Sequence, residues 1–151
     1  MKLSKIISGG QTGVDRAALD AAIMLNIPTG GFCPKGRRAE DGIIPDKYNL
    51  HETTNIKYSE RTKQNIQHSQ GTLILYWDTI TNGSLTTLEY CKTFNKPHFK
   101  VDMNKTPNYQ IEKIDYWIQS NQIKTLNIAG PREDGSDIYT HANNYLIHLL
   151  S

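Results

Sequence analysis

Three turns that contain glycine carry the residues of this sequence that could do chemistry. They cover residues 9–13, 83–86 and 130–132, and each follows a short apolar run. If the apolar runs are parallel strands, the three turns lie at the same edge of one sheet, and a helix follows each turn. The first turn of a helix presents free N–H groups and the positive end of the helix dipole. The pattern therefore predicts a small-molecule site for a phosphate or another anion.

The first turn consists of Gly9, Gly10, Gln11, Thr12 and Gly13. Adjacent glycines after a strand let a ligand approach the backbone closely, and Gln11 and Thr12 add side-chain donors. Thr12 is also the expected N-cap of the next helix. The turn lacks the lysine of a P-loop and the spacing of the dinucleotide-binding fingerprint. We expect its N–H groups to hold phosphate; a tight turn without a ligand is the alternative.

The second turn supplies another helix start. Gly83 precedes Ser84, and Thr86 lies in the first turn of the expected helix. Ser84 is the expected N-cap, and capping alone would explain its presence. Glu89 lies one helical turn further along. The position after a strand of a parallel sheet favours ligand contact.

The third turn supplies a cation. Gly130 and Pro131 precede Arg132, whose guanidinium suits bidentate recognition of phosphate or carboxylate. A solvated ion pair between Arg132 and Glu133 is the alternative.

A charged loop adds further candidates for ligand contact. Lys35 and Arg37, on either side of Gly36, could reach an anion. Glu40 or Asp41 could bind ribose hydroxyls or a metal. The alternative is a solvated loop, which is the more common role of mixed charge.

A polar helix is expected over residues 59–69, with Ile66 as its only aliphatic residue. Arg61 and Asn65 share one face of it, and Thr62 lies beside them. Such a helix either bridges solvent or forms the wall of a ligand cleft.

The composition sets limits on function. A net charge of +2 gives no case for nucleic acid or an anionic membrane as partner, and the longest apolar stretch, near residues 17–25, is too short to span a bilayer. The beginning of the chain does not resemble a signal peptide, so we expect a cytoplasmic protein. Cys33 and Cys91 do not make a disulfide framework, and Cys33 is expected to be a structural thiol. None of the five histidines has metal-ligand spacing, so no metal site is predicted.

The apolar pattern predicts strands alternating with helices. Strands are expected at residues 5–8, 29–32, 50–53, 72–77, 98–101 and 125–129, and helices at 14–25, 59–69, 84–94, 109–120 and 138–150, with a loop at 33–47. This order predicts one α/β domain over residues 1–151: a Rossmann-like three-layer sandwich with a mainly parallel sheet of five to six strands and helices on both faces. Helix 14–25 is apolar almost all round, so a second subunit is expected to cover it in a dimer or tetramer.

Several motifs together resemble a known family. The sequence Ser-Gly-Gly-Gln-Thr-Gly-Val-Asp-Arg at residues 8–16 resembles the opening of the molybdenum carrier family, also described as the circularly permuted YpsA group of the SLOG superfamily. The resemblance continues through residues 30–37, 39–42, 48–50 and 52–53, through Arg61, Thr62 and Asn65, and through the turns at 83 and 127–132. It implies a Rossmann-like fold and a nucleotide-type ligand at the helix starts that follow the glycine turns.

The resemblance also suggests two activities. The same superfamily contains the LOG enzymes, which release ribose 5-phosphate from nucleotides. Thr86 and Glu89 keep the spacing of the LOG motif, although residues 83–85 do not repeat its glycines. The carrier name implies binding of the molybdenum cofactor, whose pterin carries a phosphate.

We therefore predict a protein that binds a phosphorylated nucleotide or nucleotide-like ligand and assembles as a homo-oligomer. The alternatives are an N-glycosidic hydrolase with Glu89 or Asp41 as acid or base, and a carrier or sensor for a phosphorylated pterin or a signalling nucleotide. Gly13→Val is expected to abolish binding and leave the fold largely intact. The predicted binding residues are Gly9, Gly10, Gln11, Thr12, Gly13, Asp15, Arg16, Lys35, Gly36, Arg37, Glu40, Asp41, Arg61, Thr62, Asn65, Gly83, Ser84, Thr86, Gly130, Pro131 and Arg132.

Overall fold

Five strands form one parallel sheet in the computed structural model, which describes residues 2–106 and 108–151. Their order across the sheet is β2 (Thr29–Gly30), β1 (Lys5–Ile7), β9 (Thr125–Ala129), β7 (Gly71–Tyr76) and β8 (His98–Asp102). The first five residues of β7 are all buried, as expected for a strand covered on both faces. The predicted Rossmann-like α/β fold is confirmed.

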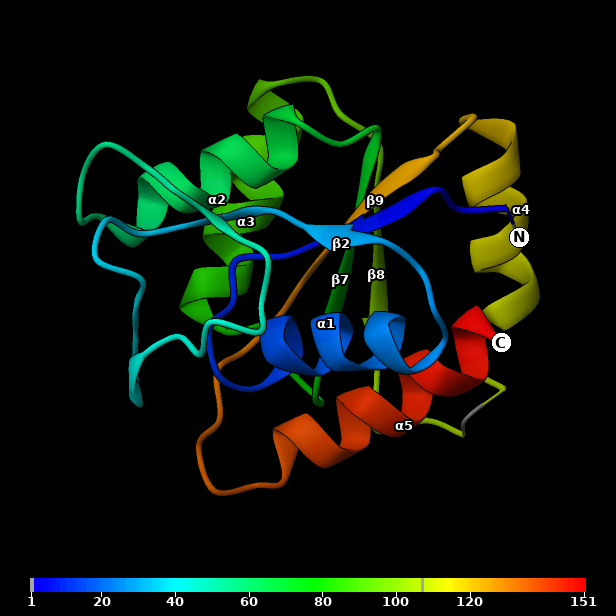
Figure 1. Ribbon diagram of the computed structural model, residues 1–151. Helices are drawn as coiled ribbons and strands as arrows, with labels where there is room; N and C mark the ends of the chain where they lie inside the picture. The colour runs from blue at the N-terminus through cyan, green and yellow to red at the C-terminus, as the bar shows by residue number, and fades with distance from the viewer. Residues whose placement is uncertain (1, 107) are drawn as a thin grey trace.

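Helices cover both faces of this sheet (Figure 1). On one face, α1 (Val14–Met24), α4 (Ile111–Ser120) and α5 (Ile138–Leu150) bury their apolar stripes in a common core with Leu73, Leu126 and Ile128 of the sheet. On the other face lie α2 (Tyr58–Gln67) and α3 (Asn82–Thr93), which contact each other. The alternation of strand and helix thus produces the three layers that the sequence pattern predicts.

The segment between β2 and α2 differs from the prediction. The single strand expected at 29–32 is two short strands, β2 and β3 (Phe32–Cys33), separated by Gly31 with a φ of 129°. Gly31 breaks the strand because it lies against the backbone of Ser8, where a Cβ atom would come within 2.2 Å of the Ser8 oxygen. β3 pairs in parallel with β6 (His51–Glu52). The expected loop 33–47 contains an antiparallel pair, β4 (Arg38–Ala39) and β5 (Gly42–Ile43).

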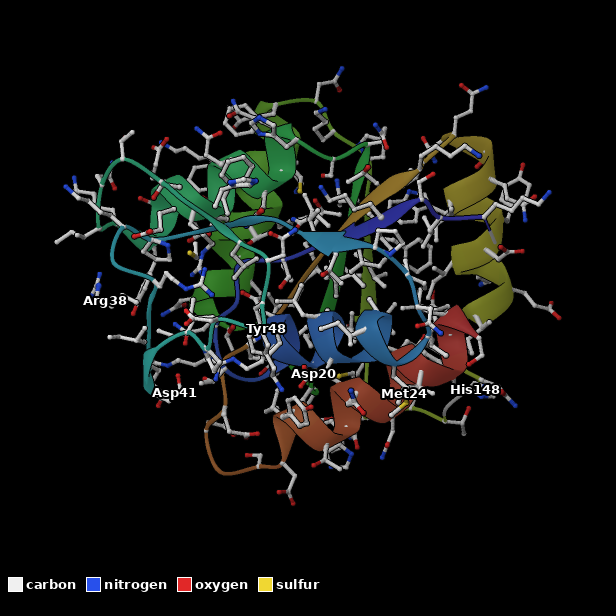
Figure 2. The ribbon with its side chains drawn as sticks, in the orientation of Figure 1. Asp20, Met24, Arg38, Asp41, Tyr48 and His148 are labelled. Atoms are coloured by element: carbon white, nitrogen blue, oxygen red, sulfur yellow. The ribbon has the colours of Figure 1, made fainter. Side chains whose placement is uncertain are left out.

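This segment also covers the second side of α1. Leu19 packs in a small core with residues of the segment, namely Cys33, Ala39, Ile44, Tyr48 and Leu50. The Tyr48 hydroxyl donates a hydrogen bond of 2.7 Å to Asp20 Oδ1 on α1, and Figure 2 shows the two side chains together. The expectation that another subunit covers α1 is therefore wrong for Leu19, because the chain itself does so. Ile23 and Met24, at the end of α1, stay exposed.

Among the described residues, no helix combines the length and the apolar content needed to cross a membrane.

Candidate functional site

A pocket of about 570 Å³ lies where the three glycine turns meet, at the carboxyl ends of β1, β7 and β9. Every one of the turns contributes to its lining. The contributions are Gly9 and Gln11 from the first turn, Gly83 and Thr86 from the second, and Gly130, Pro131 and Arg132 from the third. Parallel strands bring these residues together because their carboxyl ends share one edge of the sheet.

The start of α3 is the part of the pocket best suited to an anion. The helix begins at Asn82 with Thr81 as its N-cap residue, and no side chain caps it. Its first-turn N–H groups therefore lack intrahelical partners and carry the positive end of the helix dipole. A Cβ atom added at Gly83 would meet nothing within 4 Å, so the backbone is open there. The prediction of Ser84 as N-cap is wrong, because Ser84 is a buried residue inside the first turn.

The first glycine turn is held by the chain's own groups. The Gly10 N–H donates to Ser8 Oγ at 3.3 Å, the Gln11 N–H to Asp15 Oδ2 at 3.4 Å, and the Thr12 N–H to Gln11 Oε1 at 2.9 Å. These amides are thus engaged within the protein, and the cradle of free N–H groups expected across residues 9–13 is not present in that form.

Thr12 is likewise used to join loops. The N-cap of α1 is Gly13, and no side chain caps the helix, so the prediction of Thr12 as N-cap is wrong. The Thr12 hydroxyl donates to Glu40 at 2.8 Å and accepts the Glu133 N–H at 3.2 Å. Thr12 therefore connects the first turn to the charged loop and to the third turn.

Gly13 is required by the backbone. Its φ is 80°, and an added Cβ atom would come within 2.4 Å of the Pro131 carbonyl oxygen. The expectation that Gly13→Val keeps the fold is therefore wrong, because any side chain at Gly13 would push the third turn away from the first.

Helix α2 forms a wall of the pocket through Tyr58, Ser59, Arg61, Thr62 and Asn65. Arg61 is 8% exposed, and its Nη1 donates to the Gly9 carbonyl at 2.9 Å. The polar face of this helix therefore closes a cleft, as one of the two interpretations predicts.

Asn65 fixes the position of this wall. Its side-chain oxygen accepts the Phe32 N–H at 2.8 Å, and its side-chain nitrogen donates to the Phe32 carbonyl at 3.0 Å. The amide of Asn65 thereby pairs with the backbone of β3 as a neighbouring strand would.

The comparisons with known proteins agree with this fold. The sequence profile of the circularly permutated YpsA SLOG family matches residues 6–150. The chain belongs to this family. It is also similar to a protein from Syntrophus aciditrophicus SB, named "Putative molybdenum carrier protein", whose crystal structure is known at 1.45 Å resolution. The two are 43% identical, the similarity covers 99% of this chain and 96% of the other, and the TM-score is 0.93. The comparison with curated proteins gave no match.

In this member of the circularly permutated YpsA SLOG family, Asp15 is the buried acid of the pocket. The residue is 8% exposed, and burial raises the pKa of its carboxyl from 3.8 to about 6. The Arg61 guanidinium at 3.9 Å and the N–H groups of Gln11 and Gly9 act in the opposite direction. A carboxyl that titrates near neutral pH inside a pocket is typical of functional sites.

Asp15 should make stability depend on pH. Its pKa is higher in the folded protein than the usual 3.8, so the folded state binds the proton more tightly. The stabilisation that the protonated Asp15 gives is fully present below about pH 4 and is lost as the pH rises through 6. This shift of the pKa corresponds to a loss of about 3 kcal/mol in the free energy of unfolding. Chemical denaturation of the wild type and of Asp15→Asn at pH 4, 5, 6 and 7 tests this. Between pH 4 and pH 7 the wild type should lose about 3 kcal/mol more of its free energy of unfolding than Asp15→Asn does. A difference between the two proteins that stays constant with pH would contradict the prediction.

The charged loop does not line the pocket. The Arg37 guanidinium donates to four backbone carbonyls, of Ile44, Pro45, Tyr48 and Leu50, so Arg37 holds the loop together. Lys35 and Gly36 are exposed, and the Gly36 N–H donates to Glu52. Arg37 therefore stabilises its own loop and does not contact the pocket, contrary to the prediction that it reaches an anion.

Arg16 and Asp41 are paired outside the pocket. Arg16 Nη1 and Asp41 Oδ2 lie 2.5 Å apart, and this hydrogen bond lowers the pKa of Asp41. Glu89, the other predicted acid or base, is exposed on α3 and is not part of the lining. The carboxyl groups that do line the pocket are those of Asp15 and Asp134.

Several lining residues were not predicted from the sequence. They are Tyr58, Ser59, Thr81, Asn82, Thr87, Asn127, Ile128, Ala129 and Asp134. Asn127 could have been recognised from the sequence, because it is a polar residue in the middle of the apolar strand β9. It is 3% exposed and donates to Thr72 Oγ1 at 3.2 Å. A buried polar residue inside a central apolar strand is a reasonable candidate for a site.

Cys33 and Cys91 are both buried, and burial raises the pKa of each thiol. A raised pKa disfavours the reactive thiolate, which fits the expected structural role of Cys33. Within residues 2–106 and 108–151, no group of three or more His, Cys, Asp or Glu side chains could hold a metal ion.

Proposed function

We propose that the pocket binds a phosphorylated nucleotide or nucleotide-like molecule with its phosphate at the start of α3. The observation that carries this proposal is the meeting of an uncapped helix start with Arg132 in one pocket of about 570 Å³. The open backbone at Gly83 lets an anion approach the first-turn N–H groups. The exposed Arg132 side chain supplies the balancing positive charge.

A carrier role fits the same pocket. The similar protein from Syntrophus aciditrophicus SB is named "Putative molybdenum carrier protein". The molybdenum cofactor contains a pterin that carries a phosphate. A carrier has to bind its cargo and release it unchanged, so it needs a phosphate anchor and a ring pocket more than reactive groups. A signalling nucleotide could be sequestered by the same contacts.

Gly83→Asp tests the phosphate position directly. A carboxylate in the first turn of α3 should leave stability equal or slightly higher, because it replaces a helical glycine and complements the helix dipole. The same carboxylate repels a bound phosphate, so affinity should fall at least about tenfold, or 1.4 kcal/mol. Calorimetric titration with nucleoside monophosphates and a phosphorylated pterin, together with thermal unfolding, measures both effects.

Gly83→Ala is the matched control, because it changes the backbone similarly and adds no charge. We expect its affinity to remain within about threefold of the wild type. Equal binding by Gly83→Asp and Gly83→Ala would place the phosphate elsewhere.

A hydrolase that cleaves N-glycosidic bonds is the second candidate function. The observation in its favour is the carboxyl group of Asp15, whose pKa of about 6 suits acid–base catalysis near neutral pH. Because Glu89 and Asp41 lie outside the lining, Glu89→Gln should leave any turnover unchanged and Asp15→Asn should abolish it. Release of free base from a panel of nucleotides is the measurement, and absence of release from all of them would exclude this function.

A further inference from the structure

Two ends of the pocket differ in their chemistry. Asp15 and Gln11 belong to the α1 start that follows β1, whereas Asn82 and Gly83 belong to the α3 start that follows β7. Strand β9 lies between β1 and β7 in the sheet (Figure 1), so the two starts follow strands that are not neighbours. The helices α1 and α3 lie on opposite faces of the sheet, so their starts approach the pocket from different sides.

At the α1 end, the pocket offers a hydrogen-bond acceptor, the carboxylate of Asp15, and does not suit an anion. The carboxylate of Asp15 has about four acceptor positions. Backbone N–H groups of Gln11 and Gly9 use two of them, and the Gln11 contact is long at 3.4 Å. Arg61 Nη1, at 3.9 Å, is beyond hydrogen-bond distance. Asp15 is therefore a buried carboxylate of the lining that retains capacity for further donors.

The charge of Asp15 also fixes the direction of a ligand. A phosphate placed at the α1 end would face this carboxylate, whereas at the α3 end it meets first-turn N–H groups. Arg61 of α2 and Arg16 of α1 are the charged groups that act on Asp15, and each already has another partner, the carbonyls of Gly9 and Gly10 respectively. Arg132 and Asp134 come from the turn after β9.

We propose that Asp15 selects ligands whose ring presents a ring N–H beside an exocyclic amino group, the paired donors of guanine and pterin rings. This inference rests on the proposed function. Two parallel N–H groups match the two oxygens of a carboxylate, in the same way that an arginine does. A ring that offers an acceptor at this edge, as adenine does, would leave the buried carboxylate without a donor and would bind weakly.

The test is a comparison of ligands that differ only at the ring edge. Calorimetric titration at pH 7.5 would use guanosine, inosine and adenosine monophosphates, since inosine keeps the ring N–H and lacks the amino group. We expect the wild type to bind guanosine monophosphate at least about tenfold more tightly than the other two. A phosphorylated pterin presents the same pair of N–H donors as guanine. Whichever of guanosine monophosphate and the pterin binds more tightly identifies the ring that the pocket fits.

Asp15→Asn removes the charge with little change in shape and should reduce the preference to less than about threefold. A merely structural role of Asp15 would weaken all three nucleotides alike and leave the ratio unchanged. Asp15→Ser is a second variant, for use if Asp15→Asn does not fold. The ratio of the wild-type affinities for the three nucleotides tests the proposal without any variant.

The outcomes separate the two proposals. Binding of all three monophosphates with equal affinity by the wild type, or an unchanged ratio in both folded variants, would overturn the role of Asp15 and leave the phosphate site standing. Absence of binding by every nucleotide and by the phosphorylated pterin would overturn the proposed function and this inference together.

Discussion

Replacing Gly13 with alanine is expected to lower the free energy of unfolding by about 4 kcal/mol. Gly13 has a φ of 80° and a ψ of −128°, a conformation that costs a residue with a side chain about 1–3 kcal/mol, and overpacking adds about 1–3 kcal/mol. Overpacking follows here because the new Cβ atom would lie 2.4 Å from the Pro131 oxygen and 2.8 Å from the Glu133 nitrogen. Urea denaturation followed by circular dichroism measures the change.

Gly135→Ala is the matched control for this prediction. Gly135 also has a positive φ, of 90°, and lies in the loop before α5, but an added Cβ atom there would meet nothing within 4 Å. Its substitution should therefore cost only the conformational part, about 1–2 kcal/mol. If both variants lose the same stability, the contact between the first and third turns is not what requires glycine at position 13.

Replacing Arg61 with alanine is expected to cost about 3–5 kcal/mol, because it removes one partner of a buried ion pair. The substitution leaves the Gly9 carbonyl without its side-chain donor and the Asp15 carboxylate without its nearest cation. It also empties the space beside Gly9, where the Arg61 side chain packs against the backbone. Thermal and urea unfolding at pH 7 measure the loss.

Arg38→Ala is the control for Arg61→Ala. Both guanidinium groups lie over the ring of Tyr58, at 4.8 Å for Arg38 and 5.1 Å for Arg61, but Arg38 is exposed. We expect Arg38→Ala to cost less than about 1 kcal/mol. In the background of Asp15→Asn the cost of Arg61→Ala should fall by about 1–2 kcal/mol, because no charge is left unpaired. An equal cost in both backgrounds would show that Arg61 acts only through Gly9 and packing.

Hydrophobic periodicity was sufficient for the long elements. Strand β9 at Thr125–Ala129 and helix α5 at Ile138–Leu150 begin and end at the predicted residues. Their apolar residues lie on faces that contact the core, so the pattern reports burial directly. The strand expected at 29–32 was wrong because its interruption depends on the approach of Ser8 to Gly31, a contact between distant residues.

The candidate site divides in the same way. Glycine turns after parallel strands were enough to predict that residues 9–13, 83–86 and 130–132 would gather at one edge. The sequence did not indicate which of their amides are engaged within the protein. The side chains of Ser8, Gln11 and Asp15 accept N–H groups of the first turn, whereas the start of α3 has no side-chain cap. Charge alone did not distinguish Arg37, which holds its loop, from Arg132, which lines the pocket.

The amino-acid sequence by itself determined the order of strands and helices, the parallel sheet and the edge at which ligands are expected, because these follow from periodicity and from turns between neighbours in the chain. Only the tertiary structure decided that Asp15 and Arg61 are buried side by side and that the segment after β3 covers α1. These features depend on contacts between segments far apart in the sequence, and local residue patterns carry no information about which distant groups will exclude water from them.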